Sequence, residues 1–210
     1  VETTTGVSLV RTAQRTLNLG LLGNVTSNYE LDGTGVGIAI VDSGVREDHR
    51  SFVNAAGLGR VVGRANFVDN DNQINVDEYG HGTHVASLAA GGDGAMMNAG
   101  DDLYLDRYQG VAPGAHLLNL RVLDDEGVGR TAGLINAIDW LFANRTKYNI
   151  RVVNLSLGAP AIETWRNDPL CRAVRKLTAA GMVVVAAAGN NGKNASGQKI
   201  YGAIHSPGND

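Results

Sequence analysis

The chain has 210 residues, of which 43% are hydrophobic and 19% charged, and its 18 basic and 21 acidic residues give a formal net charge of −3. This length allows one sizeable domain, and this composition excludes disordered and fibrous proteins. The absence of a basic run argues against nucleic acid as a partner, and no apolar stretch reaches the roughly 18 to 20 residues that cross a bilayer, so we expect no membrane segment. A single cysteine, Cys171, excludes an internal disulfide framework and a multi-cysteine zinc site.

Apolar, β-rich runs alternate along the chain with helical patterns, which is typical of a parallel sheet with helical crossovers. We expect one or two helices before Asp32. The predicted strands are residues 36–41, 115–123, 152–157 and 182–187, and the predicted helices are residues 81–90, 131–148 and 169–180. Residues 91–109 and 202–210 have the composition of loops. The sequence therefore predicts an α/β fold with a mostly parallel central sheet.

Three polar positions lie at predicted strand ends or helix starts, where ligands bind in such sheets. Asp42 follows the first strand and could cap the next turn, bind a metal or orient an imidazole. His81 begins a helix in which His84 follows one turn later, and the pair could be a capping and a core histidine or could carry chemistry. Asn190 follows the last strand and could belong to a turn or donate a hydrogen bond to a developing oxyanion.

Two other classes of protein fit these positions less well. A dinucleotide-binding module is suggested by the glycines of residues 33–37, but they precede a strand, whereas a phosphate-binding loop follows one. A metallohydrolase using Asp42, His81 and His84 would lack a glutamate beside the first histidine, and its histidines are three residues apart rather than four. Zinc analysis would test the second alternative.

Five blocks of the chain resemble the subtilisin-like serine proteases, or subtilases. They are IVDSGV at residues 40–45, GHGTHVA at 80–86, GVAPGA at 110–115, NLSLG at 154–158 and AAGNNG at 187–192. The blocks follow the family's order from about residue 33 to the end of the chain. The resemblance implies a subtilisin-like, three-layer, doubly wound sandwich. It also implies that residues 1–210 are the N-terminal portion of a single catalytic domain, incomplete at the C-terminus.

The resemblance implies a role for each of the three polar positions. Asp42 would be the carboxylate of an Asp-His-Ser triad, and His81 would be its general base and acid. Asn190 would be the side-chain donor to the oxyanion. His84 is not the family's catalytic histidine, and we expect it to pack and hydrogen-bond within its helix.

Peptide substrates can pair their backbone with exposed strand edges. The resemblance implies two such edges in this chain. Their residues are Gly127, Val128 and Gly129 on one side and Ser156, Leu157 and Gly158 on the other. Ala188 and Gly189, after Ala187, would line the floor of the primary specificity pocket and leave it roomy and apolar.

The chain departs from the family's pattern at the nucleophile, because no Gly-Thr-Ser-Met-Ala type block is present. Ser43, Ser87 and Ser156 stand in other contexts and are not credible replacements. We therefore expect a C-terminal segment beyond Asp210, continuous or separate, to carry the nucleophile. Without it, the chain would be a catalytically inactive scaffold with the same fold.

The expected chemistry needs no cofactor and no metal ion, although the family often binds calcium. Ser51 falls where an aspartate of one family calcium site is expected. The acidic residues of the following loop are Asp93, Asp101, Asp102 and Asp106, and they could bind calcium or simply form an acidic surface. A peptide or protein is the expected substrate, and the resemblance implies a secreted or extracytoplasmic location.

Overall fold

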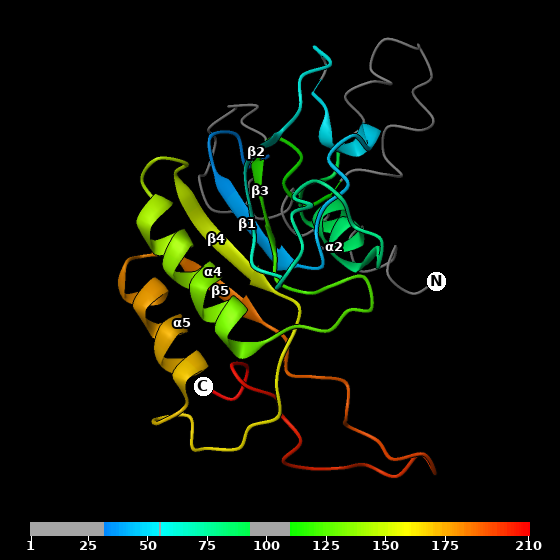
Figure 1. Cartoon of the computed structure of the whole chain (residues 1–210), viewed down its shortest axis with the longest axis vertical. Helices are drawn as coiled ribbons and strands as arrows, with labels where there is room; N and C mark the ends of the chain where they lie inside the picture. Colours follow the sequence, from blue (N-terminus) through cyan, green and yellow to red (C-terminus); the bar gives the residue numbers. More distant parts are fainter. Residues whose placement is uncertain (1–31, 55, 93–109) are drawn as a thin grey trace, which may run out of the picture.

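The computed structural model describes residues 32–54, 56–92 and 110–210. The helices expected before Asp32 and most of the predicted loop at 91–109 lie outside these ranges. Within them, the fold is a five-stranded sheet with helices on both faces (Figure 1).

All neighbouring strands of the sheet pair in parallel, which confirms the predicted sheet. The strands are β1 (Gly37–Asp42), β2 (Val61–Asn66), β3 (His116–Arg121), β4 (Ile150–Leu155) and β5 (Val183–Ala186), in the spatial order β2-β3-β1-β4-β5. Every residue of β1 is buried. A central strand covered on both faces has no polar side to show to water, and this explains its continuous apolar run.

The sequence prediction missed β2, which lies at one edge of the sheet. Val61 and Gly63 are buried in this strand, whereas the residues between and after them are exposed or half-buried. Gly63 is a weak strand former, but a Cβ atom at this position would lie 3.2 Å from Leu118 and from Tyr148. Close packing against these side chains therefore decides the conformation, and local propensity does not.

The helices begin close to their predicted positions. They are α2 (His81–Ala90), α4 (Thr131–Asn144) and α5 (Pro169–Ala179), with a short 3-10 turn η1 (Arg50–Phe52). The carboxylate of Asp168 accepts the N–H groups of Leu170 and Cys171 at 2.8 and 3.2 Å, so it caps the start of α5. In the described ranges, no helix is both long and apolar enough to span a bilayer.

The helices divide the molecule into three layers (Figure 1). Helices α4 and α5 pack together on one face of the sheet, and α2 covers the other. The core beneath α4 and α5 includes Leu118, Leu120, Leu141, Val153 and Leu177. The core beneath α2 includes Ile40, Phe52, Ala86 and Leu117. The predicted three-layer α/β sandwich is thus confirmed.

The order of the strands opens a crevice beyond their carboxyl ends. After β1 the chain runs to β2, on the far side of β3, whereas after β4 it crosses through α5 to β5, on the opposite side of the sheet. The connections leaving the neighbouring strands β1 and β4 therefore diverge, and such a switch point is where α/β sheets bind ligands. Asp42, the last residue of β1, lies at this point.

Candidate active site

The carboxylate of Asp42 and the imidazole of His81 form the centre of the site. Asp42 Oδ1 lies 2.7 Å from His81 Nδ1 and also accepts the backbone N–H of Ser43 at 2.8 Å. Asp42 is fully buried, whereas the His81 side chain is 40% exposed. The carboxylate holds Nδ1, so Nε2 is the ring nitrogen left for proton exchange on the open side.

Burial governs the charge on Asp42. Desolvation raises the pKa of this carboxyl above its ordinary value, and the hydrogen bonds from His81 and Ser43 oppose that rise. Its second oxygen, Oδ2, is buried and has no hydrogen-bond partner among the described residues. Among the described residues, the carboxylate therefore makes its bonds to the imidazole and to Ser43 through Oδ1.

Glycines bring the start of α2 onto the end of β1. Gly80 precedes His81 with a φ of 82°, a left-handed conformation that favours glycine. A Cβ atom at Gly82 would lie 2.1 Å from the carbonyl oxygen of Gly44 and 3.0 Å from Cβ of Asp42. The glycine-flanked histidine in the sequence is thus explained by a contact between backbones that leaves no room for a side chain.

His84 does not pack within the molecule as expected; it is exposed. The buried positions of α2 are Gly82, Ala86 and Ala90, which recur every fourth residue and define the face turned to the sheet. His84 lies off this face. The expectation was wrong because the helix buries its small residues.

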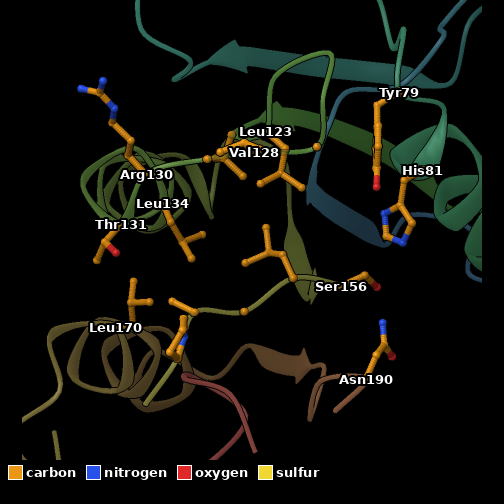
Figure 2. Close-up of a pocket in the computed structure, with 17 residues that line it drawn as sticks. Tyr79, His81, Leu123, Val128, Arg130, Thr131, Leu134, Ser156, Leu170 and Asn190 are labelled. Carbon is orange, nitrogen blue, oxygen red and sulfur yellow. The ribbon is translucent and has the colours of Figure 1, made fainter. Parts of the chain in front are cut away.

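A pocket with a volume of about 530 Å³ opens beside His81. Its lining residues are Tyr79, His81, Val122, Leu123, Gly127, Val128, Gly129, Arg130, Thr131, Leu134, Ser156, Leu157, Gly158, Ala159, Pro160, Leu170 and Asn190. Figure 2 shows His81, Ser156 and Asn190 toward one end of the pocket and Arg130 and Leu170 toward the other. The structure thus brings His81 and Asn190, from α2 and from the segment after β5, to one cavity.

Both predicted substrate edges line this pocket: Gly127, Val128 and Gly129 on one side and Ser156, Leu157 and Gly158 on the other. The first edge is tied to the segment that follows β3, because Leu123 and Gly129 form an isolated antiparallel bridge. On the second edge, the Nδ2 group of Asn154 donates to Ser156 Oγ at 2.8 Å.

The pocket lining described by the structure does not include Ala188 or Gly189, which were expected at its floor. The His205 ring lies over Gly189, where an added Cβ atom would be 3.1 Å from the ring. The backbone N–H of His205 also donates to the carbonyl of Ala188 at 2.9 Å. The small residues thus allow a close approach of the segment around His205, and their place at the floor of a primary specificity pocket stays a prediction.

Sequence reasoning missed Tyr79 and Asp77. The Tyr79 ring lies where a side chain on Gly127 would project, since a Cβ atom there would be 2.5 Å from it. Asp77 is buried and hydrogen-bonded to Ser43, Gly80 and Thr83. The only sequence signal for Asp77 was an acidic residue shortly before a helix start, where a carboxylate can cap free N–H groups.

The structure describes no group of three or more His, Cys, Asp or Glu residues that could hold a metal ion in residues 32–54, 56–92 and 110–210. The acidic loop residues considered for calcium, from Asp93 to Asp106, lie outside these ranges. Calcium binding there remains an expectation from the sequence.

Comparison with known proteins identifies relatives of the chain. The model of the subtilase family matches residues 33–209. Thermitase of Thermoactinomyces vulgaris is 38% identical over 170 residues, which are 81% of this chain and 53% of that protein. Subtilisin DY of Bacillus licheniformis is 36% identical over 168 residues, or 80% of this chain and 52% of that protein.

Solved structures show the same relationship. Sphericase superimposes with a TM-score of 0.63 at 29% identity, covering 88% of this chain and 53% of that one. A cold adapted subtilisin-like serine proteinase gives a TM-score of 0.57 at 32% identity, covering 81% and 52%. The chain thus spans about half the length of these relatives.

Proposed function

The chain belongs to the subtilase family, and from this we propose that it supplies the acid–base half of a serine endopeptidase that cleaves peptide bonds. One observation carries the proposal: the 2.7 Å contact between Asp42 Oδ1 and His81 Nδ1 beside an open pocket. A buried carboxylate that orients a half-exposed imidazole is the arrangement that activates a hydroxyl nucleophile.

In the proposed mechanism, His81 Nε2 takes the proton of a serine hydroxyl as its oxygen bonds to the scissile carbonyl carbon. Asp42 stays ionised, keeps the imidazole in the required tautomer and stabilises the imidazolium. The side-chain amide of Asn190 donates to the oxygen that becomes negative. His81 then passes its proton to the leaving amine as the C–N bond breaks. In the second half of the reaction, His81 takes a proton from water as the water oxygen bonds to the acyl carbon, and returns it to the serine oxygen as the ester bond breaks.

The nucleophile is proposed to lie on a C-terminal segment that follows this chain. Ser43 is buried, and its hydroxyl donates to Asp77 at 2.7 Å while accepting the N–H of Gly82 at 3.0 Å. The hydroxyl of Ser87 donates to the backbone carbonyl of His84 at 2.8 Å. Both hydroxyls thus serve the local structure.

Strand β5 supports the same proposal. Its side chains Val183 and Val185 are 60% and 52% exposed, although both are apolar and lie in the sheet. Apolar patches of this kind in folded proteins mark places that another segment or partner covers. We propose that the segment carrying the nucleophile covers them.

The proposed substrate is an extended peptide or protein segment. The glycines of one edge, Gly127 and Gly129, let another backbone come close, and apolar side chains such as Leu134, Leu157 and Leu170 line the pocket. An apolar side chain of the substrate would bury against them, and no cofactor is needed for the reaction.

Labelling with a fluorophosphonate followed by mass spectrometry tests the proposal. Active protein would be prepared from the culture medium and from the cells separately, which also tests the proposed extracytoplasmic location. We expect the label on a serine beyond Asp210, and no labelling after substitution of His81 by Ala. A label on a residue of the present chain, or full activity from residues 1–210 alone, would refute the assignment of the nucleophile.

A further inference from the structure

Asp77 lies just before α2, and its carboxylate accepts four hydrogen bonds. Oδ1 accepts the hydroxyl of Ser43 at 2.7 Å and the backbone N–H of Gly80 at 2.9 Å. Oδ2 accepts the backbone N–H of Thr83 at 2.7 Å and the Thr83 hydroxyl. The residue is only 9% exposed, so these bonds form away from bulk water.

This environment is complementary to a carboxylate and not to an amide. Each oxygen faces one backbone N–H group, which can only donate. An asparagine would place its NH₂ group against one of these N–H groups and leave a buried donor without a partner. Asp77 therefore has an electrostatic requirement that its neighbour Glu78, which is exposed, does not share.

The network reaches both members of the acid–base pair. Ser43 donates its hydroxyl to Asp77 and its backbone N–H to Asp42, and it accepts the N–H of Gly82. Through Gly80 and Thr83, Asp77 also holds the backbone on either side of His81. One carboxylate is thus bonded to the end of β1 and to the first turn of α2.

We propose that Asp77 is a positioning residue that fixes the start of α2 relative to the end of β1 and so sets the contact between Asp42 and His81. The proposal rests on the proposed function only for its effect on turnover. Geometry within a fraction of an ångström matters here, because a misplacement of about 1 Å costs on the order of 100-fold in rate.

The test compares Asp77→Asn with Glu78→Gln in the full-length protein. Both substitutions remove one negative charge from the same segment, but only the first removes hydrogen-bond acceptors from the network. We expect Asp77→Asn to lower kcat between about tenfold and 100-fold with little change in KM, and Glu78→Gln to leave both unchanged.

A second readout does not depend on turnover. The Nδ1–H proton of His81, hydrogen-bonded to Asp42, is expected far downfield in the ¹H NMR spectrum, and Asp77→Asn should shift or broaden it while Glu78→Gln does not. If the resonance shifts but kcat is unchanged, Asp77 positions His81 as proposed, and the result counts against the proposed catalytic role of the contact between Asp42 and His81. An unchanged resonance in a folded Asp77→Asn protein would overturn the proposal.

Thr83→Val keeps the proposal testable if Asp77→Asn does not fold. This variant keeps the side-chain shape and the backbone N–H but removes one hydroxyl donor to Asp77, together with the acceptor of the Arg46 backbone N–H at 2.9 Å. We expect a smaller change of the same resonance and a smaller loss of kcat. An unchanged resonance in the folded Thr83→Val protein would count against the proposal, whatever the change in thermal stability.

Discussion

Strands β1 and β5 both lead into residues of the proposed active site, but the molecule holds them differently. β1 pairs with β3 and β4, and all of its residues are buried. Among the described residues β5 pairs with β4, and its valines alternate between exposed and half-buried. Asp42 is therefore positioned by the core of this chain, whereas Asn190 follows a strand with far less support.

The segments after the two strands differ in the same way. Beyond β1, the backbone is tied to α2 through Ser43 and Asp77. Beyond β5, Asn190 is exposed. The neighbouring Asn191 contacts His205, with 2.9 Å between Nδ2 and Nε2. The contact between Asp42 and His81 is thus held in place by this chain, whereas the position of Asn190, the proposed oxyanion donor, would gain more from a segment that packs on β5.

The largest expected effect is the loss of turnover on substitution of Asp42, which lies at the end of the buried strand β1. In the full-length protein, Asp42→Asn should lower kcat about 10⁴-fold with little change in KM, since the carboxylate acts on charge that forms in the transition state. Steady-state kinetics measure this. The matched control is Asp48→Asn, which removes a carboxylate that is 74% exposed. A rise in KM alone would mean that Asp42 binds substrate.

Asn190→Ala tests the segment after β5. This substitution should lower kcat by about 10²- to 10³-fold, which is the range for loss of one oxyanion donor. Asn191→Ala is the control, because it removes the neighbouring amide. Equal losses in both variants would show that the segment as a whole matters and that Asn190 has no special role.

Stability should follow the same contrast. Ile40→Ala in β1 removes a fully buried side chain and should lower the free energy of unfolding by about 2–5 kcal/mol. Val185→Ala in β5 should change it within about 0.5 kcal/mol in residues 1–210, as surface substitutions do. Urea unfolding would give both values. If a further segment covers β5 in the full-length protein, Val185→Ala should lower the free energy of unfolding there by clearly more than in residues 1–210. An equally small effect in both proteins would contradict the proposal that a segment covers β5.

The smallest expected effect is on the pH dependence of stability. Burial raises the pKa of Asp42 above its ordinary value of 3.8, so the folded state disfavours the charged form. The contribution of Asp42 to stability is therefore present below that value and is lost as the pH rises through the raised pKa. Thermal unfolding of the parent and of Asp42→Asn should show the parent losing stability relative to the variant over this range. A relative gain with rising pH would mean that the imidazole outweighs desolvation.

The sequence predicted the parts of the fold whose pattern is local. Continuous apolar runs indicated four of the five strands, because strands buried on both faces have few polar residues. The edge strand β2 was missed, since Gly63, Arg64 and Asn66 carry no β-rich pattern and pair with β3 only in the folded sheet. The sequence pattern also located α2, but it did not indicate which face of the helix is buried, so His84 was wrongly expected to pack.

The candidate site divides in the same way. Asp42, His81 and Asn190 were singled out because strand ends and helix starts of such sheets carry ligand sites, and the resemblance to the subtilases implied a role for each. The structure places His81 against Asp42 and brings His81 and Asn190 to one pocket. Asp77 and Tyr79 were missed, because the bond from Ser43 to Asp77 and the contact of Tyr79 with Gly127 join distant parts of the chain that meet only in the fold. For Gly189, the sequence indicated a close approach but could not identify the neighbouring residue, which is His205.

The central place of β1 in the sheet has a consequence for how the protein folds. Gly37 of β1 pairs with His116 and with Ile150, which follow it by about 80 and about 110 residues. Contacts between such distant parts of a chain must overcome a large loss of chain entropy before they stabilise anything, so folding through them is slow. During synthesis β1 emerges long before either partner strand. We therefore expect the contact between Asp42 and His81 to form late, so that the proposed peptidase activity would arise only once the rest of the sheet has assembled around β1.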